Sequence, residues 1–492
     1  MTIDYAAIGP ELALAITALV VLVADLFLAG DRKRLLNPVS AVGTVVAIVL
    51  TVRLWGPGND ETFGGMFVAN DYALSFKLLF LGALLAILAV SYQHFAEGRY
   101  FQGEYYFLLL TSFVGMLVMP SARDLLLLFV ALETVSIPGF VMAGLRKRDL
   151  YSSEAALKFF LVGVLAVAVM LFGLSFVYGA AGTTSLAGVA AALAAAGDVE
   201  PILLGSLLLV IVGFGFKVSA VPFHFWAPDT YSGAPLPVTA MLAVASKAAG
   251  FAGLVAICFI AFEPLADAWS PVMGFIAVVT MTVGNLIALQ QRDMVRLLAY
   301  SSVAHAGYVL LPFGIASPGL VATNALAVRA VLFYLIAYAV MNVGAFGVVI
   351  GVHRRTGQRS IADYAGLGQR APALAVAMTV FMLSLGGAVP LVGFWAKFVV
   401  FQATAGAAAY VLATFLVLNT VLAFFYYLAV VRTMWMDAPR AGAPLLRPGL
   451  AINASVAVLA LGTVALGIVP WHQNLTVGGD IVVPQPVASA VP

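Results

Sequence analysis

Charged residues are scarce in this chain of 492 residues: Asp, Glu, Lys and Arg make up 9% of it, whereas 63% is hydrophobic. A water-soluble protein of this length needs many more charges on its surface. The composition therefore excludes a soluble fold and predicts an integral membrane protein with little room for a soluble domain. The net charge is only +2 and no basic stripe extends beyond short loops, so we expect no nucleic-acid partner.

Cysteine is almost absent, because Cys258 is the single one. This excludes an internal disulfide, a Cys-ligated zinc site and an iron–sulfur cluster held by this chain alone. Nucleotide-binding patterns are missing as well: no GxGxxG follows a strand, and GxxxxGK[ST] does not occur. No histidine pair has the spacing of haem or metal ligands. We therefore expect that the chain binds no cofactor and no metal of its own.

Long apolar runs dominate what is present. Runs of about 17–25 residues are long enough to cross a bilayer as helices, and here they alternate with short polar or Gly/Pro-rich loops. We predict an all-α polytopic membrane protein of about fourteen transmembrane helices, the first of which is retained because it lacks the basic start of a signal peptide. The predicted helices cover residues 8–29, 36–54, 72–93, 104–120, 124–144, 153–179, 203–226, 236–261, 270–290, 295–314, 323–351, 372–405, 408–434 and 449–470. The segment after residue 180 is Ala/Gly-rich, and we predict a long connection with a short amphipathic turn there.

Lysine and arginine are distributed unevenly between alternate loops. With the N-terminus outside, sixteen of the 24 lie in inner loops: Arg32, Lys33, Arg34, Arg99, Arg146, Lys147, Arg148, Arg292, Arg296, Arg354, Arg355, Arg359, Arg370, Arg432, Arg440 and Arg447. Four are assigned to the outer side: Arg53, Lys77, Arg123 and Arg329. The positive-inside rule then predicts a multi-pass protein of the cell (inner) membrane with both termini on the outer, periplasmic side.

Short motifs recur along the chain at a spacing of about 168 residues. The recurring pairs are AVP at 220–222 and 388–390, FWA at 225–227 and 394–396, Arg123-Asp124 and Arg292-Asp293, and EAALKFFL (154–161) with RAVLFYL (329–335). Each copy covers five predicted helices, the fourth to eighth and the ninth to thirteenth. Because five is an odd number of crossings, the second copy must be inverted in the membrane, as in many transporters.

The repeat divides the chain into four predicted parts. Residues 1–103 hold the first three helices, 104–261 the first repeat, 270–434 the second repeat, and 435–492 the last helix and a tail. In each repeat one helix contains a proline beside small residues, VSAVPFHFWAP in the first and LGGAVPLVGFWAKF in the second. Proline removes an intrahelical bond, so we predict that these two helices are broken. A single proline kink is common in membrane helices, but a matched pair in inverted repeats points to a transport site.

Four lysines stand inside apolar runs: Lys158, Lys217, Lys247 and Lys397. A lysine at the middle of a bilayer costs roughly 2.5–3.5 kcal/mol on insertion scales, so buried charges usually mark a path for ions or protons. Glu133 stands in another such run. Desolvation favours the neutral form of a lysine whose carboxylate partner moves away, which makes Glu133–Lys217 a candidate switch. The alternative is a static pair that stabilises the bundle.

The other candidates carry weaker signals. Lys247 has only small neighbours and Lys397 follows a predicted break, so both are candidate relay groups, with snorkelling as the alternative for Lys397. Lys158 lies near a helix start, where snorkelling or pairing with Glu154 competes with a supporting role. His224 and His305 are titratable and lie in or near irregular helices, so each is a candidate proton relay or a structural histidine. The carboxylates of Asp25 and Asp229 are expected at the membrane interface.

Together these motifs resemble one known family, the antiporter-like subunits of respiratory NADH:quinone oxidoreductase (complex I), and within it the N-type subunits. The segments that carry the resemblance are LETVSIPGF with Glu133, EAALKFFLVG with Lys158, GFKVSAVPFHFWAPDTYSGAP with Lys217 and His224, the helix with Lys247, and PLVGFWAKF with Lys397. M-type subunits usually have a glutamate at the position of Lys397, and L-type subunits carry a long C-terminal lateral helix that we do not expect here.

The resemblance implies a proton channel in the membrane arm of complex I. It assigns Glu133 and Lys217 as a coupling pair, Lys247 as the central relay, and Lys397 as the residue near the exit half-channel. It also implies that NADH, FMN, iron–sulfur clusters and quinone bind to partner subunits, and that the partners of this chain are other membrane-arm subunits and the lipid bilayer. Two alternatives remain: a Mrp-type cation/proton antiporter subunit, which shares these lysines, and a membrane scaffold whose buried charges are static.

Overall fold

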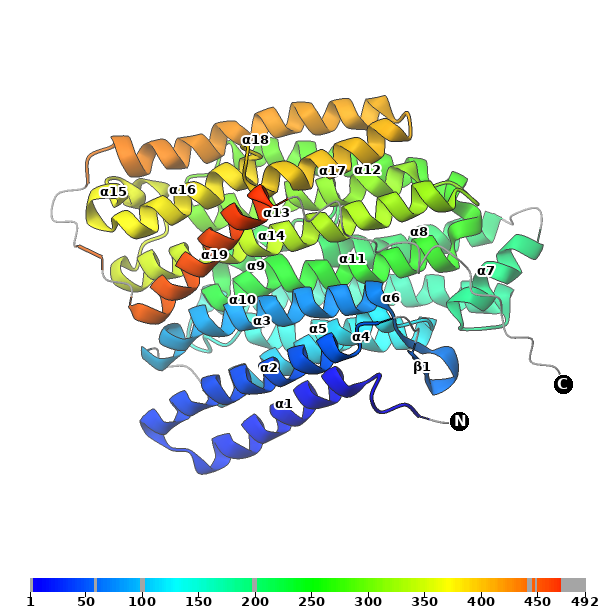
Figure 1. Ribbon diagram of the computed structural model, residues 1–492, viewed down its shortest axis with the longest axis horizontal. Coiled ribbons are helices and arrows are strands. Elements are labelled where there is room, and N and C mark those ends of the chain that lie inside the picture. The colour runs from blue at the N-terminus through cyan, green and yellow to red at the C-terminus, as the bar shows by residue number, and fades with distance from the viewer. Residues whose placement is uncertain are drawn as a thin grey trace.

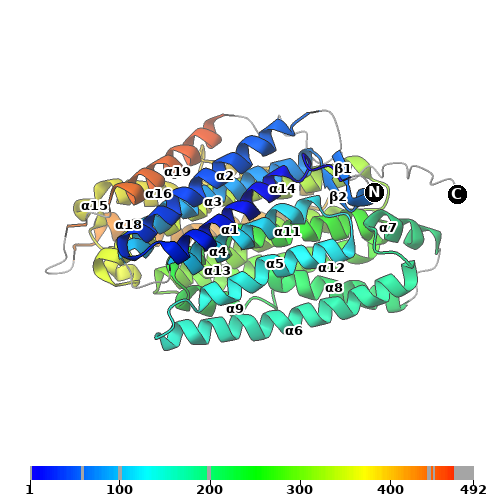
Figure 2. The same ribbon diagram turned by 90° about the horizontal axis from the view of Figure 1, so that it is seen from below.

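The computed structural model describes residues 3–56, 60–97, 102–196, 201–439, 445–446 and 449–469. In this part of the chain thirteen helices are long and apolar enough to cross a membrane. They lie roughly side by side along the long axis of the molecule (Figure 1), and the view from below shows the same alignment (Figure 2). The predicted span 372–405 consists of two shorter helices, Pro372–Gly386 and Val392–Gly406. The all-α polytopic prediction with about fourteen spans is therefore confirmed.

The helices of the first half are α1 Gly9–Phe27, α2 Leu36–Arg53, α3 Asp71–Glu97, α4 Gln102–Val118, α5 Leu125–Ala143, α6 Leu150–Ala181, α7 Leu186–Ala195, α8 Pro201–Val218, α9 Trp226–Gly233, α10 Leu236–Met241 and α11 Lys247–Ala256. Those of the second half are α12 Ala266–Ala288, α13 Met294–Leu310, α14 Val321–Thr356, α15 Leu367–Arg370, α16 Pro372–Gly386, α17 Val392–Gly406, α18 Tyr410–Met436 and α19 Leu450–Ile468. Strands β1 Asp60–Thr62 and β2 Phe67–Ala69 form one antiparallel hairpin. The short turn predicted after residue 180 is α7.

Matching caps delimit corresponding helices of the two repeats. Asp124 caps the N-terminus of α5 and Asp293 that of α13, and each carboxylate accepts hydrogen bonds from backbone N–H groups of the first turn. This satisfies donors that have no partner inside the helix. Asp124 also forms a β-bridge with Ser185, just after α6, and Asp293 forms one with Ser360, just after α14. The recurring Arg-Asp motif therefore performs the same structural task twice.

Both predicted breaks are present, and they have the same backbone geometry. The predicted helix 203–226 ends early, at Val218, and resumes as α9; Ser219 has φ 60° and the N–H of Ala220 bonds the carbonyl of Gly215 at 2.8 Å. At the second break Gly387 has φ 100°. A positive φ ends a helix because the next N–H turns back onto the last turn.

The second break follows the same pattern about 168 residues later. The N–H of Ala388 bonds the carbonyl of Leu383 at 2.9 Å, the same five-residue closure as at the first break. The predicted helix 372–405 is therefore α16 followed by α17. Both breaks also contain a cis proline, Pro222 and Pro390.

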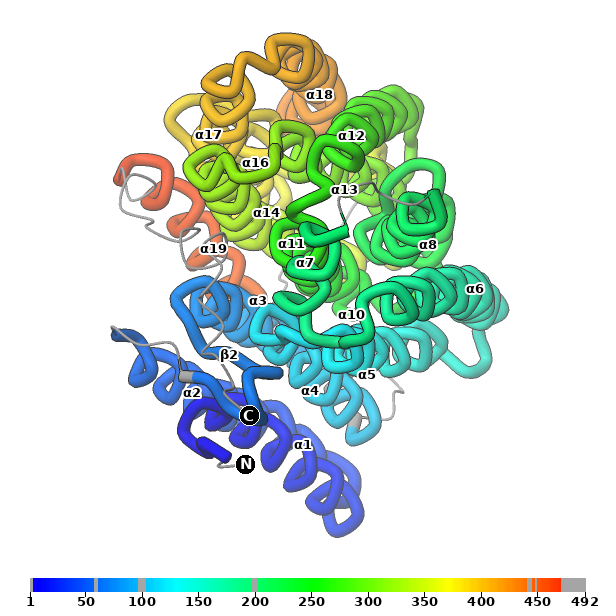
Figure 3. The backbone as a smooth tube through the Cα atoms, turned by 90° about the vertical axis from the view of Figure 1, so that its right-hand side faces the viewer, coloured from blue at the N-terminus to red at the C-terminus, as the bar shows by residue number. Residues whose placement is uncertain are grey.

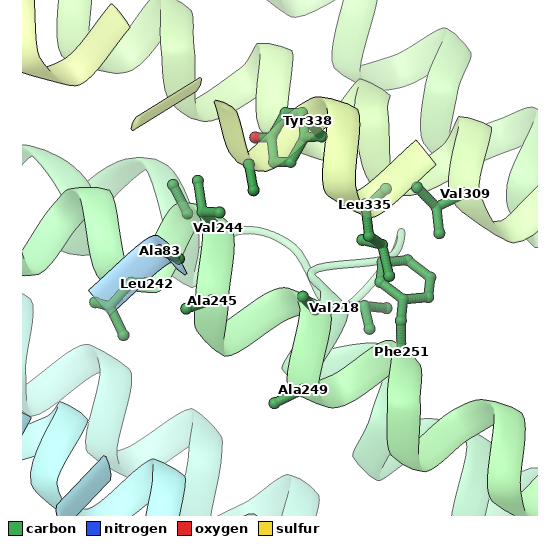
Figure 4. Close-up of a cluster of buried hydrophobic side chains, with 14 of the residues drawn as sticks. Ala83, Val218, Leu242, Val244, Ala245, Ala249, Phe251, Val309, Leu335 and Tyr338 are labelled. Atoms are coloured by element: carbon green, nitrogen blue, oxygen red, sulfur yellow. The ribbon is translucent and has the colours of Figure 1, made fainter. Parts of the chain in front are cut away.

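The centre of the bundle is formed by α11, α13 and α14, which Figure 3 shows enclosed by the other helices in an end-on view. Small and apolar side chains pack there. Figure 4 shows Ala249 of α11, with Val244 and Ala245 of the helical turn just before it, opposite Leu335 and Tyr338 of α14. α1, α2 and α6 lie at the periphery and expose apolar side chains, as expected for helices that face lipid or other membrane subunits.

Lys77, which is counted on the outer side, has a buried side chain. It lies in the second turn of α3, has no exposed surface, and forms an ion pair with Glu11 of α1 at 2.8 Å. The hydropathy pattern could not reveal this because the partner lies in another helix. The assignments of Arg99, Arg440 and Arg447, and the predicted tail from residue 470 onward, fall outside the described residues.

Candidate functional site

Three of the predicted lysines are buried in the interior of the bundle. Lys217, Lys247 and Lys397 are 2%, 2% and 5% exposed. Each lies at an irregular point of the backbone. Lys217 is the penultimate residue of α8, just before the first break; Lys247 directly follows a π-helical turn, Leu242–Ser246; and Lys397 lies in the second turn after the other break. Such irregularities free backbone groups and are frequent at functional sites.

Lys217 is held by a neutral hydroxyl group. Its Nζ donates a hydrogen bond of 2.9 Å to Oγ of Ser136 on α5. The Ser136 hydroxyl donates in turn to the carbonyl oxygen of Leu132 at 2.6 Å. Gly250 of α11 makes room for the lysine, because a β-carbon there would lie 2.8 Å from Cγ of Lys217. The lysine is thus packed tightly between α5 and α11.

Glu133 lies on α5 one turn before Ser136, but it does not touch Lys217. The two groups interact electrostatically, whereas the ion pairs among the described residues do not include this pair. The carboxylate is half-buried, and its buried Oε1 has no hydrogen-bond partner in the described part of the chain. The structure therefore places the predicted coupling pair on facing helices, with Ser136 as the group that holds the ammonium.

Lys247 also donates to a serine. Its Nζ lies 2.6 Å from Oγ of Ser302 on α13 and 5.8 Å from the centre of the Tyr231 ring, which belongs to α9. The half-helix after the first break therefore places an aromatic ring near Lys247. A ring face within about 6 Å of a cation stabilises the charge only modestly.

Lys397 lies at the second break. Its Nζ donates a hydrogen bond of 2.8 Å to the carbonyl oxygen of Gly386, the last residue of α16, and stands 4.9 Å from the centre of the Tyr308 ring. A helix C-terminus carries partial negative charge, so the ammonium caps α16 from inside the membrane protein. Lys397 and Lys247 both interact electrostatically with His305.

His305 lies on α13 and is buried. Its Nδ1 is 2.8 Å from Oη of Tyr334, and its Nε2 is 3.1 Å from Oη of Tyr427. The Tyr427 hydroxyl is also 2.5 Å from Oγ of Ser301. Figure 3 shows α11 and α13 in the middle of the bundle, with α8 on one side of them and α17 on the other.

Lys158 differs from the other lysines. It is 46% exposed and forms ion pairs of 2.8 Å with both Glu154 and Asp229. The prediction of a lysine buried in the bundle is wrong for this residue, because α6 lies on the outer face, and the pairing with Glu154 that competed with it is present. Asp229 is bound in addition by Arg296 of α13 at 3.1 Å.

The same short helix, α9, is held at its other end by two arginines. Arg146 donates to the carbonyl oxygen of Gly233 at 2.5 Å, and Arg359 donates to that of Ser232. These carbonyls lie at the C-terminus of α9, where cations are favourable. Cations from both repeats therefore fix the half-helix that carries Tyr231.

His224 lies in the break between α8 and α9 and is half-buried. It interacts electrostatically with Lys247, but among the described residues no hydrogen bond joins it to the three buried lysines. Asp25 forms an ion pair with Lys33 at 2.7 Å. Among the described residues, no group of three or more His, Cys, Asp or Glu side chains is placed to hold a metal ion.

Sequence reasoning missed the partners of the lysines. Ser136 follows Glu133 by three residues, which places both on one helix face, so this neighbour was accessible from spacing. Tyr427 stands in the apolar run AFFYYLAV, where a tyrosine gives no signal by itself. The carbonyl of Gly386 has no sequence signature, because any residue supplies one.

Comparison with known proteins identifies relatives of the whole chain. The family model described as NADH:quinone oxidoreductase/Mrp antiporter, TM, matches residues 122–423. NADH-quinone oxidoreductase subunit N 2 of Symbiobacterium thermophilum is 39% identical, over 94% of each chain.

Solved structures agree with this. A chain of respiratory complex I from Thermus thermophilus superposes with a TM-score of 0.78 at 31% identity, covering 94% of this chain and 97% of that one. A chain of the Mrp complex from Dietzia sp. DQ12-45-1b has a TM-score of 0.80 at 21% identity, covering 96% and 97%, and so shares the fold. The match over residues 122–423, together with relatives of nearly equal length, shows that this chain belongs to the NADH:quinone oxidoreductase/Mrp antiporter transmembrane family.

Proposed function

We propose that this chain is a proton-translocating membrane-arm subunit of an NADH:quinone oxidoreductase (complex I). Its relatives of similar length are named subunit N of that enzyme. The observation that carries the proposal is the chemistry around the three buried lysines. Lys217, Lys247 and Lys397 donate to two hydroxyl groups and a carbonyl oxygen, not to carboxylates.

Lys77 provides the internal contrast. It is equally buried, but Glu11 neutralises it at 2.8 Å. A carboxylate in direct contact fixes the charge of a lysine, whereas a hydroxyl or carbonyl partner accepts a hydrogen bond without matching the charge. A buried lysine with neutral partners can therefore gain and release a proton with a much smaller change in free energy. The first arrangement suits a static pair and the second suits a relay.

The electrostatic switch acts at Lys217 and Glu133. When a change in a partner subunit moves the two closer, the carboxylate stabilises the ammonium form of Lys217. When they separate, the lysine has Ser136 alone, and burial then favours release of its proton. The proton passes through the interior to Lys247 and then past His305 to Lys397. His305 interacts electrostatically with both of these lysines.

Lys397 is the last of the proposed relay groups. The carbonyl oxygen of Gly386 at the C-terminus of α16 stabilises its ammonium form. Binding to the Gly386 carbonyl retains the proton at the break, and movement of either half-helix releases it. Lys158 and His224 have supporting roles, since Lys158 is bound to the half-helix α9 and His224 lies in the break before it.

The remaining assignments belong to the same proposal. Residues 104–261 and 270–434 form two inverted repeats between the N-terminal helices of 1–103 and the C-terminal part 435–492. The chain resides in the cell membrane with both termini on the outer side. NADH, FMN, iron–sulfur clusters and quinone bind to partner subunits, whose redox chemistry drives proton movement in this chain.

A Mrp-type cation/proton antiporter subunit is the alternative function. The chain from the Mrp complex shares the fold with a TM-score of 0.80, but its 21% identity supports the fold alone. The complex I chain is 31% identical at nearly the same coverage, which favours complex I. Purification of the native complex distinguishes the two, because complex I contains this chain and oxidises NADH.

The test of the proposed function measures proton pumping in membranes that contain the assembled complex. Lys217→Ala, Lys247→Ala and Lys397→Ala are expected to reduce pumping and coupled quinone reduction while the complex still assembles. Lys33→Ala is the matched control, because Lys33 is partly exposed and paired with Asp25, and it should pump normally. Normal pumping by all three buried-lysine variants would contradict the proposal and leave the scaffold as the explanation.

A further inference from the structure

The hydroxyl group of Tyr427 lies between two polar groups of another helix. Tyr427 belongs to α18 and has no exposed surface. Its Oη is 2.5 Å from Oγ of Ser301 and 3.1 Å from Nε2 of His305. Ser301 and His305 are four residues apart on α13, so both side chains project from one face of that helix. One hydroxyl from α18 therefore bridges two successive turns of α13.

The bridge lies next to groups that interact with two of the buried lysines. Lys247 donates to Ser302, the residue next to Ser301, and both Lys247 and Lys397 interact electrostatically with His305. An imidazole carries a proton from one side to the other only if each nitrogen has a hydrogen-bond partner. Both nitrogens of His305 have one: Tyr427 at Nε2 and Tyr334 at Nδ1.

We propose that Tyr427 is a relay residue that transfers protons between Ser301 and His305. This inference rests on the proposed function, since it supplies a step between Lys247 and Lys397. A proton that reaches the Ser301 hydroxyl moves to the Tyr427 oxygen as the Tyr427 proton moves to Nε2 of His305. The O–H bond of Tyr427 breaks and a new one forms, so the tyrosine ends neutral. His305 becomes an imidazolium and is neutral again once Nδ1 releases its proton on the Tyr334 side.

Among the described residues, no hydrogen bond joins the neighbouring tyrosine to His305. Tyr426 is also buried, and its hydroxyl donates to the amide oxygen Oδ1 of Asn285 at 3.0 Å. That amide belongs to a group of contacts in which Nδ2 of Asn285 donates to Tyr308 and to Asn419. The Tyr426 hydroxyl also interacts with Ser301 and Tyr427, so the Tyr427 hydroxyl is the one that joins this group of hydroxyls to the imidazole.

The experiment replaces the hydroxyl with hydrogen. Tyr427→Phe keeps the ring and removes the bridge, and it is assayed in the assembled complex for proton pumping and for coupled NADH:quinone turnover. Tyr105→Phe controls for the loss of a buried Tyr–Ser bond, because Tyr105 of α4 contacts Ser91 of α3 at 2.7 Å. We expect Tyr427→Phe to slow pumping about 100-fold or more, the range of a lost proton-transfer group, with the control near wild type.

Each outcome decides the inference. Wild-type pumping by Tyr427→Phe overturns it, and so does an equal loss in Tyr105→Phe, which would show a general effect of removing a buried tyrosine–serine bond. If Tyr427→Phe does not assemble, Ser301→Ala removes the other side of the bridge, and normal pumping by that variant also overturns the inference. Lys217→Ala, Lys247→Ala and Lys397→Ala are measured in parallel: if all three pump normally, the proposed function fails, whereas slow pumping by these variants beside a normal Tyr427→Phe rejects the tyrosine relay alone.

Discussion

The ion pair between Lys77 and Glu11 gives the sharpest test of how buried lysines differ in this protein. Their side chains are 0% and 7% exposed and 2.8 Å apart, and Nζ of Lys77 also lies 4.8 Å from the centre of the Phe67 ring. Lys77→Met removes the ammonium but keeps most of the volume. The carboxylate of Glu11 then remains between α1 and α3 without its counter-charge.

The structure sets the size of the effect. Removal of one partner from a buried ion pair costs about 3–5 kcal/mol, because the remaining charge is uncompensated. Lys77→Met and Glu11→Met should each lower the free energy of unfolding by about this amount. In the double variant both charges are gone and two apolar side chains fill the site, so the loss should be at most about 1 kcal/mol, since apolar replacement of a buried pair is often neutral or stabilising. The coupling energy between the two sites is then about 5–10 kcal/mol in magnitude.

The measurement combines stability with function. The free energy of unfolding of the four chains (wild type, two single variants, double variant) is measured by denaturant titration in one lipid–detergent mixture, and proton pumping is measured in the assembled complex. The double variant is expected to assemble and pump like the wild type. If the double variant lost as much free energy of unfolding as the two single variants together, the pairing would be contradicted. Reduced pumping by a double variant that assembles normally would show that Lys77 belongs to the relay, which would refute the distinction between paired and unpaired buried lysines.

Two further changes test the packing at the break and the ion pairs on the outer face. A β-carbon on Gly393 would lie 1.8 Å from the carbonyl oxygen of Ser384, whereas Gly406 of the same helix has open space. Gly393→Ala should therefore destabilise the chain by about 3 kcal/mol, and Gly406→Ala should be neutral or slightly stabilising. Thermal-denaturation midpoints of the purified chain would show the difference. Asp229→Asn removes ion pairs whose members are 37–46% exposed, and since such pairs contribute at most about 1 kcal/mol each, the amount of assembled complex in membranes should stay near wild type; a loss of most of it would indicate that α9 depends on this carboxylate.

Hydropathy predicted most of the fold because the bilayer leaves few alternatives. A long apolar run must form a helix in lipid, since every backbone N–H and C=O needs an internal partner. The positions of the spans and the two broken helices follow from this rule and from the prolines. The exact ends did not follow: α8 stops at Val218 because Ser219 takes a left-handed conformation, and such a choice depends on the surrounding packing.

The sequence also predicted one part of the candidate site, the charged residues, and not the other part, their surroundings. Composition and spacing alone selected Lys217, Lys247 and Lys397, because a charge inside an apolar run is costly wherever it points. The same argument selected Lys158, which proved to be half-exposed and paired, and it overlooked Lys77. One-dimensional hydropathy does not contain the direction in which a helix presents a side chain to the other helices.

Local composition was enough to predict a bundle of membrane helices with two proline breaks and charges inside it. The contacts of each buried charge became visible in the folded bundle alone: a carboxylate for Lys77, hydroxyls for Lys217 and Lys247, and a helix terminus for Lys397. These two kinds of property depend on interactions of different range along the chain. Helix formation and insertion depend on local composition, whereas the state of a buried charge depends on partners that packing brings from distant parts of the chain.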